Sequence, residues 1–467
     1  MDENRRHVIK AICIWFVIIL LVLLTIISVY YFGGIEALQK IIDSGPHTNL
    51  LVTLLSLTIF WMIAGGLLIL IYYQRINSGN ILAFVCFIII SFLYLNILRE
   101  RSDFGDIDDY INAAKNLFNR ETFHLRYFYP PFLATILQPF VISGDKTIFG
   151  VYWVINFISL LLFYYLLRKM LMHYNFSSNL STIITFCFMV VNVPILRTML
   201  YAQPNLHVIN LIFVCLLFYE RSKIISALAL AIAVHLKISP VIFVLLFLFE
   251  KDFKWFIWFS LITLSIALFT IIIYGFSPYH DFLLNLRYIY QANGLAYRDT
   301  SIDSFFRAVF SFLDIHNSIM FYSILITKIV LTIVVAWIGY RVIENNNFFE
   351  TESKGKIVYN GAPIVFVLMM LLSPLVWEHH AVFVSFTYLI LLKKIESNSE
   401  WFIFGFAYFI EFLLPTFDFF PWSYGRLVSP LIILYLIYRL SCRSTDSDYF
   451  KRVNIFLDNL NIRINKI

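Results

Sequence analysis

Four carboxylates fall within seven positions of one segment, namely Asp103, Asp106, Asp108 and Asp109. A carboxylate can act as a general base that removes the proton of an attacking hydroxyl. By position alone, Asp106 is better explained as the N-cap of the helix that follows, where Asp108 and Asp109 would favour the helix dipole. Capping and base catalysis do not exclude each other, so the segment remains a candidate for both.

Cations and amides that could bind an anion stand further along the chain. Lys237 precedes Pro240, and His379 follows Glu378. Cations and N–H donors bind phosphate, and they stabilise the charge that develops when phosphate leaves. Together with one carboxylate, such groups could move a sugar from a lipid phosphate to an acceptor hydroxyl. The candidates for the phosphate are Lys237, His379, His380 and Arg307, and those for other substrate contacts are Gln203, Asn205, Tyr110 and Trp377.

Several of these residues also have a structural explanation. Lys237 can extend from a helix end to the lipid headgroups, and Trp377 can anchor at the membrane interface. Gln203 and Asn205 can satisfy backbone groups near Pro204. Arg197 and Arg426 can pair with lipid headgroups. His379 and His380 could bind a metal together with Glu378, but we disfavour this metal site because the side chains of adjacent histidines diverge. No metal or cofactor is expected.

The composition predicts the elements that position these groups. Of 467 residues, 60% are hydrophobic and 14% are charged, whereas soluble domains are about 45–50% apolar and about 25% charged. Because about 20 apolar residues span a bilayer, we expect an all-α, polytopic membrane protein of about 12–14 transmembrane helices. The candidate spans are 11–32, 50–72, 81–98, 149–168, 181–196, 204–219, 222–236, 238–250, 254–276, 317–342, 358–373, 381–392, 402–414 and 427–441, with the pair 222–236 and 238–250 broken by Lys237 and Pro240.

The loop charges predict the orientation. Lys and Arg concentrate in the loops that lie inside if the N-terminus is cytoplasmic, which accounts for the net charge of +6 without a nucleic-acid partner. The outer loops are then 99–148, 277–316 and 415–426, and the candidate residues all fall at or near the outer face. An amphipathic helix is expected after Asp106, on the outer membrane surface. The expected regions are an N-terminal hairpin (1–80), a catalytic transmembrane domain (81–441) and a cytoplasmic tail (442–467).

Six short motifs carry a resemblance to a known family. In order, they are "DIDDYINAA", "YPPF", "AQPN", "HLKISP", "SIDSFFR" and "SPLVWEHH". This order, from Asp106 to His380, resembles glycosyltransferase family 87 of the GT-C superfamily, whose members are polyprenyl-phosphate-dependent mannosyl- and arabinosyltransferases. Ala202 stands where the family usually has Gly, Asp299-Thr300-Ser301 replaces a usual Asn-Gln-Ser, and Val376 replaces a small residue before Trp377.

The resemblance implies a role for each matching position. Asp106 matches the catalytic carboxylate, with Asp103 as the alternative base. Lys237, His379 and His380 match positions near the donor phosphate, and Gln203 and Asn205 match the Gln-x-Asn pair. It implies a mannose or arabinofuranose-like sugar on a polyprenyl-phosphate donor, a lipid or glycan acceptor, and an extracytoplasmic site in the plasma membrane. Membrane lipids are the other expected partners.

Two other functions remain open from the sequence. A transporter or flippase for lipid-linked sugars would share the groove and the cations but would need no base, and it would favour broken helices in matching halves, which are not evident. A polysaccharide ligase or polymerase of another fold would use Arg and His of a large loop. The sequence does not determine the sugar, the acceptor, the anomer or the oligomeric state.

Overall fold

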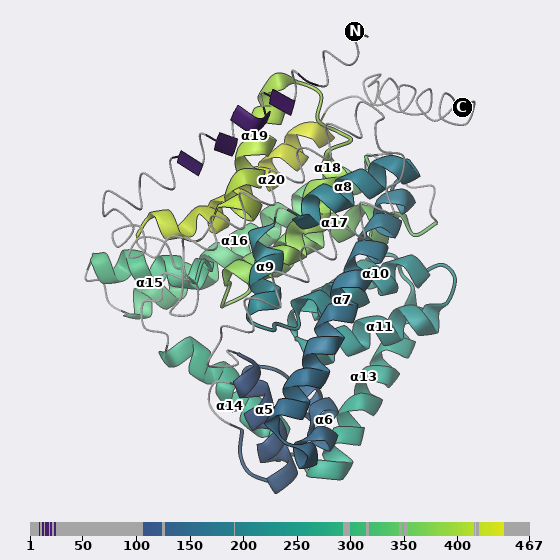
Figure 1. Cartoon of the computed structure of the whole chain (residues 1–467), viewed down its shortest axis with the longest axis vertical. Coiled ribbons are helices and arrows are strands. Elements are labelled where there is room, and N and C mark those ends of the chain that lie inside the picture. The colour runs from purple at the N-terminus through teal and green to yellow at the C-terminus, as the bar shows by residue number, and fades with distance from the viewer. Residues whose placement is uncertain are drawn as a thin grey trace.

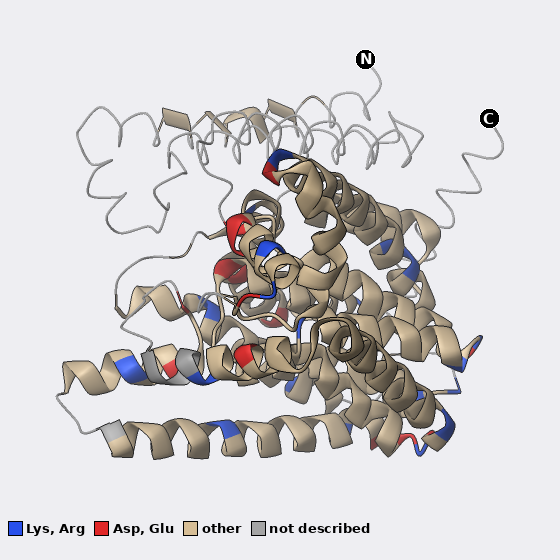
Figure 2. Ribbon diagram, turned by 90° about the horizontal axis from the view of Figure 1, so that it is seen from below, with Lys and Arg blue, Asp and Glu red and all other residues tan. Residues whose placement is uncertain are grey.

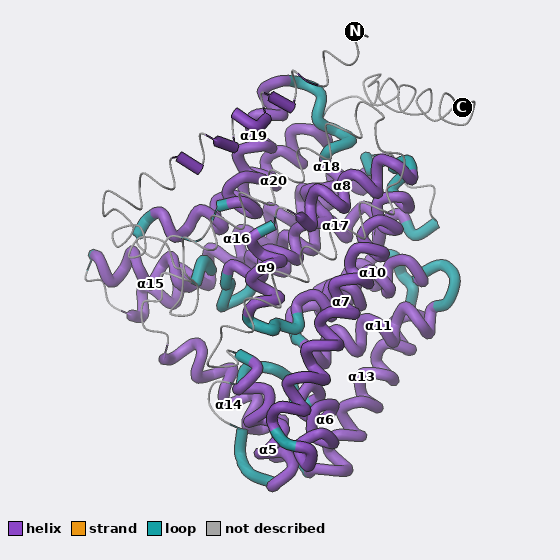
Figure 3. The backbone as a smooth tube through the Cα atoms, viewed as in Figure 1, coloured by secondary structure: helices purple, strands orange, loops and turns teal. Residues whose placement is uncertain are grey.

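The computed structural model describes residues 106–123, 127–190, 192–292, 299–313, 317–344, 348–349, 354–414, 416 and 420–442, with single positions between 9 and 24. Within these ranges every regular element is a helix and no strand occurs, as Figure 3 shows. The expected all-α fold is confirmed. The spans expected at 50–72 and 81–98 lie outside the described residues, as does the proposed tail beyond 442.

The first group of helices surrounds the long helix α7 (Figure 1). Helix α5 packs against α6, against the short 3₁₀ helix η1 and against α7, while α10 packs between α7 and α11, and α11 packs on α13. The bounds are α5 Ile107–Asn119, α6 Phe132–Leu137, η1 Gln138–Ser143, α7 Asp145–His173, α8 Ser178–Val190, α9 Val193–Leu200, α10 Asn205–Phe218, α11 Lys223–Leu236, η2 Ser239–Phe243, α12 Val244–Phe249, α13 Phe253–Tyr274 and α14 Ser277–Ala292.

The second group packs around α17. This helix contacts α12, α16, α18 and α20, and η3 lies against α9, α10 and α17. The bounds are α15 Ile302–Phe312, α16 Asn317–Glu344, α17 Lys356–Leu372, η3 Glu378–Val384, α18 Ser385–Leu391, α19 Asn398–Tyr408, the π-helical turn η4 Phe409–Leu413, η5 Trp422–Tyr424 and α20 Gly425–Ser441.

Three described helices are individually long and apolar enough to cross a membrane: α7, α13 and α16. The bent pair α8 and α9 makes a fourth if it is one span. Long stretches of ribbon carry no charged residue (Figure 2). The expected span 181–196 is broken at Asn192, whose side chain caps α9 by accepting from Ile195 N–H (2.8 Å). The break expected at Lys237 and Pro240 is confirmed, since α11 ends at Leu236 and η2 begins at Ser239.

In two regions the structure adds detail to the expectation. The segment 277–316, expected as an outer loop, contains α14 and α15. Helix α5 forms where an amphipathic helix was expected, but most of its apolar residues, including Ile107, Tyr110 and Ile111, are buried against neighbouring helices. Protein rather than lipid therefore covers this apolar side, because the following chain folds back as α6 and η1.

Helices α10 and α11 share one end at which basic residues gather. Helix α10 runs from Asn205 to the turn that holds Arg221 and Lys223, and α11 returns from that turn to Lys237. At the basic end, two hydrogen bonds join neighbouring turns: Lys393 Nζ donates to Tyr174 O (3.0 Å), and Ile357 N donates to Glu250 Oε2 (2.8 Å). The other ends of α10, α11 and α17 meet at the pocket described next.

Candidate active site

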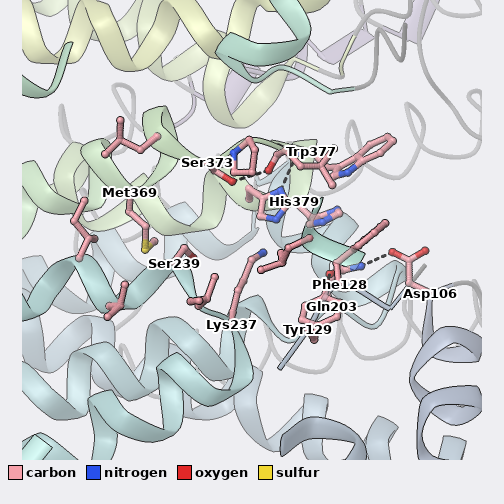
Figure 4. Close-up of a pocket in the computed structure, with 18 of the residues that line it drawn as sticks. Asp106, Phe128, Tyr129, Gln203, Lys237, Ser239, Met369, Ser373, Trp377 and His379 are labelled. Carbon is pink, nitrogen blue, oxygen red and sulfur yellow. Dashed lines mark hydrogen bonds between the residues drawn. The ribbon is translucent and has the colours of Figure 1, made fainter. Parts of the chain in front are cut away.

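A pocket of about 1100 Å³ lies where α5, the start of α10, the break after α11 and the segment 373–380 meet. In Figure 4, Asp106 lies at one side and Met369 at the opposite side, with Lys237 and His379 between them. Its polar lining is formed by Asp106, Asp109, Tyr110, Tyr129, Tyr201, Gln203, Lys237, Ser239, Ser373, Trp377, Glu378, His379, His380 and Thr416.

Asp106 occupies the N-cap position of α5, but its side chain makes no capping hydrogen bond. Its Oδ2 instead accepts a hydrogen bond from Nε2 of Gln203, a residue that lies 97 positions later in the chain. Gln203 Oε1 in turn accepts from the Tyr129 hydroxyl (2.7 Å), and Tyr129 accepts from the Tyr110 hydroxyl (3.2 Å). Because Asp106 and Tyr110 are four residues apart, both point from one face of α5. The carboxylate is thus held by a tertiary contact rather than by its own helix.

Burial raises the pKa of the Tyr129 phenol well above its ordinary value, and the nearby Asp106 and Asp109 charges act in the same direction. Hydrogen bonds with Tyr110 and Gln203 oppose this shift only in part. Tyr129 therefore keeps its proton at neutral pH and remains a hydrogen-bond donor to Gln203.

The turn before α10 places Gln203 and Asn205. Ala202 has φ of 51°, in the left-handed region, which costs a residue with a Cβ about 1–2 kcal/mol and costs glycine little. This is the position at which the motif of the resembling family usually has Gly. Gln203 N–H closes the turn on Thr198 O (2.9 Å), and α10 begins at Asn205. The conformation explains the usual Gly, and Ala202 adopts it nonetheless.

Lys237 turns into the pocket from the C-cap of α11, with an extended backbone (φ −155°, ψ 127°). Its Nζ donates to Asn205 Oδ1 (3.0 Å) and lies 5.4 Å from the centre of the Phe383 ring. Among the described residues no carboxylate pairs with this ammonium. A half-buried cation whose contacts are neutral is poised to bind an anion.

The segment after α17 presents two histidines. His379 O accepts from Thr198 Oγ1 (3.2 Å) and Asn205 Nδ2 (3.1 Å), and His380 Nδ1 accepts from Trp377 N–H (2.8 Å). The two rings lie 4.6 Å apart between centroids, so the expected divergence of the pair is wrong; the 3₁₀ turn keeps them adjacent. Within the described residues no group of three or more His, Cys, Asp or Glu could hold a metal ion.

Glu378 fixes the start of this segment. Its Oε2 accepts from Arg197 Nε (2.8 Å), while Oε1 accepts from Thr416 N (3.0 Å) and lies 3.1 Å from Arg426 Nη2. All three charged side chains are almost fully buried. The interpretation of Arg197 and Arg426 as headgroup partners is therefore wrong: tertiary packing brings both onto one carboxylate, which anchors η3 to α9 and α20.

A second contact orders the segment that precedes Trp377. Asp299 Oδ1 accepts from Val376 N (2.8 Å) and Ser301 N (2.9 Å), and Thr300 N donates to Val376 O (2.7 Å). Burial raises the pKa of Asp299 to about 6; hydrogen bonds from Val376 and Ser301 partly offset this effect, and the Asp303 charge adds to it. The Asp-Thr-Ser segment thus supports the histidine segment from outside the pocket.

The sequence candidates divide by location. Asp106, Tyr110, Gln203, Lys237, Trp377, His379 and His380 line the pocket, and Asn205 contacts two of its members. Arg307 does not line it. Near Arg307, the residues that contact 374–376 are Asp299, Thr300 and Ser301. Arg307 lies six residues after Ser301, about 1.7 turns further along α15. Asp103 lies outside the described residues.

The pocket also has an apolar wall that motif reasoning missed. Ile238, Val241 and Leu245 line it and are 47%, 45% and 44% exposed. Ile242, Met369 and Leu372 extend the same wall. Tyr129, the first residue of the YPPF motif, also lines the pocket, although the motif assigned no role to it. The local signal was present, since a tyrosine fixed beside two prolines has a restricted backbone.

The arrangement combines a carboxylate, an ammonium group, two histidines and an apolar wall in one pocket. The carboxylate can accept a proton, and the ammonium group can hold an anion at the same time. The model of glycosyltransferase family 87 matches residues 127–374, which is more than half of the chain. The match begins after Asp106 and ends before Trp377. No curated protein matches this chain.

Proposed function

We propose that this chain, which belongs to glycosyltransferase family 87, transfers a sugar from a polyprenyl-phosphate donor to a hydroxyl group of a lipid or glycan. Family membership supplies the reaction class, a membrane glycosyltransferase. The observation that carries the proposed donor is Lys237, a half-buried cation with neutral contacts, in a pocket that also holds Asp106 and an apolar wall. A phosphate attached to a hydrocarbon tail matches the cation and the wall together.

The proposed reaction is a direct displacement with inversion. Asp106 takes the proton of the acceptor hydroxyl while the acceptor oxygen bonds to the anomeric carbon. The bond between that carbon and the donor phosphate oxygen breaks, and polyprenyl phosphate leaves with the bonding electron pair. Lys237, with His379 and His380 beside it, stabilises the negative charge on the leaving phosphate. Trp377 completes the proposed substrate contacts, and Asn205 holds Lys237 in place through its Oδ1 (3.0 Å).

The proposed sidedness follows from the two ends of the bundle. The turns that hold Arg221, Lys223, Lys251 and Lys254 lie at the helix ends opposite the pocket. Since Lys and Arg mark the cytoplasmic side of a membrane protein, the pocket would open on the extracytoplasmic side of the plasma membrane. The proposed sugars are mannose or an arabinofuranose-like pentose, as the motif resemblance implies, and the reaction would serve the cell envelope.

A transfer assay with purified protein tests the proposal. Polyprenyl-phosphate sugars, radiolabelled in the sugar, are incubated with candidate lipid and glycan acceptors, and labelled product and free polyprenyl phosphate are measured. Asp106→Asn is expected to lower the transfer rate by about 10²–10⁴-fold, the range for loss of a general base, while donor binding remains. Sugar movement across vesicles without release of polyprenyl phosphate would instead identify a flippase. Full activity of Asp106→Asn with inactive Asp103→Asn would assign the base to Asp103.

A further inference from the structure

The carboxylate of Asp106 ends a chain of three hydrogen bonds. Tyr110 donates to Tyr129, Tyr129 donates to Gln203 Oε1, and Gln203 Nε2 donates to Asp106. These hydrogen bonds join α5, the segment before α6 and the turn before α10. All of its side chains line the pocket.

The direction of this chain is set by chemistry. An ionised carboxylate only accepts hydrogen bonds, so the Gln203 amide must turn its NH₂ group toward Asp106. The amide oxygen then faces Tyr129, whose hydroxyl must donate to it. Reversing the amide would place its oxygen against the Asp106 carboxylate and its NH₂ group against the donated Tyr129 proton. The Asp106 carboxylate thus sets the amide orientation, and the Tyr129 hydroxyl holds the amide oxygen in it.

We propose that Gln203 and Tyr129 are positioning residues, which hold the Asp106 carboxylate in its orientation for proton removal. The inference rests on the proposed function, in which Asp106 is the general base. It replaces the expected role of Gln203 in touching sugar or phosphate, because the Gln203 amide already uses Nε2 on Asp106 and Oε1 on Tyr129. It also gives a role to Tyr129, which has none in the reaction scheme above.

This arrangement acts on the chemical step rather than on donor binding. The donor phosphate is assigned to Lys237, which contacts Asn205 and not Gln203. A misoriented base lowers kcat, and a displacement of about 1 Å can cost about 10²-fold. Loss of the Tyr129 hydroxyl leaves the Gln203–Asp106 hydrogen bond in place but removes the bond that fixes the amide oxygen, so the expected loss is smaller.

The test measures kcat and the donor KM for Tyr129→Phe, Gln203→Leu and the double variant. We expect kcat to fall about tenfold for Tyr129→Phe and about 100-fold for Gln203→Leu, with the donor KM within about twofold of wild type. Because Tyr129 acts through Gln203, the double variant should be no slower than Gln203→Leu. Additive losses, or losses that fall mainly on KM, would overturn the proposal.

Tyr127→Phe is the matched control. Tyr127 lies two residues away in the same segment, and its hydroxyl donates to Pro130 O (3.2 Å) and accepts from Ala134 N (3.2 Å). This variant loosens the segment without touching the amide, so kcat should be retained even where thermal stability falls. A kcat loss equal to that of Tyr129→Phe would mean that Tyr129 only supports the local fold, and would overturn the proposal.

Asp106→Asn distinguishes a failure of the positioning role from a failure of the proposed general base. If Asp106→Asn is inactive while Tyr129→Phe and Gln203→Leu match wild type, the positioning role is refuted and the proposed base stands. If Asp106→Asn is fully active, the proposed base fails and the positioning role fails with it.

Discussion

Removing the Lys237 ammonium group gives the sharpest test of the donor chemistry. In Lys237→Met the side chain keeps nearly its length and loses its charge. The ammonium group contacts Asn205 Oδ1 (3.0 Å) and the Phe383 ring, neither of which is charged. We therefore expect the substitution to weaken binding of the phosphate much more than it changes the fold.

The magnitude follows from the contacts that are lost. A hydrogen bond to a charged group is worth about 1.5–3 kcal/mol, which corresponds to about a 10- to 150-fold loss of kcat/KM. For stability, two effects oppose each other. Removing a half-buried cation relieves a desolvation cost, while Asn205 Oδ1 loses its donor at a cost of about 1–3 kcal/mol. The net change in unfolding free energy should therefore be small.

Thermal unfolding with added polyprenyl phosphate measures the binding loss without turnover. At a ligand concentration of about 100 times the wild-type Kd, binding stabilises the protein by about 2.7 kcal/mol. A 10- to 150-fold weaker Kd reduces this to about 1.4–0.3 kcal/mol by the same relation. Lys237→Arg, which keeps the charge, serves as the matched variant and should retain more of the shift than Lys237→Met.

Either of two results would refute a phosphate-binding role for Lys237. Lys237→Met with wild-type kcat/KM and a wild-type ligand shift would show that the cation does not contact the donor phosphate. Loss of activity that accompanies a large loss of stability without ligand would show a structural role instead, as expected for a lysine that supports the break after α11.

Two further predictions concern the apolar wall and the Asp299 contact. Leu245→Ser should raise the KM of long-chain donors about fivefold, since about half of the ~1.5–3 kcal/mol that a buried leucine contributes is lost, and it should leave the KM of a short-chain donor unchanged. The control is Leu261→Ser, at a comparably exposed position (52% exposed) outside the pocket lining. Equal effects of the two substitutions would contradict a wall that binds the donor tail. Burial raises the pKa of Asp299 from 3.8 to about 6, so its contribution to stability is fully present below about pH 4 and is lost as the pH rises through 6, by about 3 kcal/mol in total. Thermal midpoints of wild type between pH 4 and 7 should show this dependence and those of Asp299→Asn should not, whereas parallel pH curves would contradict the assignment.

Local residue types predicted the helical class and several breaks. Apolar runs indicated α7, α13 and α16, because a helix is the simplest structure that satisfies its backbone inside a membrane. Pro240 indicated the break after α11, since proline has no N–H for the helix ladder. The bend at Asn192 was missed, although Asn followed closely by Pro194 carries the signal of an N-cap and a helix start.

The site was predictable only in part, because its contacts join positions far apart in the chain. Asp106 meets Gln203 across 97 positions, and Arg197 meets Glu378 across 181. The types of these residues suggested a base, an amide and ions, but a type does not identify its partner. Arg197 and Arg426 were misassigned for this reason, and Arg307, expected at the donor phosphate, does not line the pocket.

The sequence by itself determined that the chain is a helical membrane protein, and the order of its motifs indicated the family, because hydropathy and short-range spacing are properties of the chain. Only the tertiary structure decided that Asp106 is held by Gln203 instead of capping its own helix, that Lys237 turns into the pocket, and that Glu378 is held by two arginines. Each of these outcomes depends on which helix ends meet, and helix packing sets that arrangement without a local signal in the residues concerned.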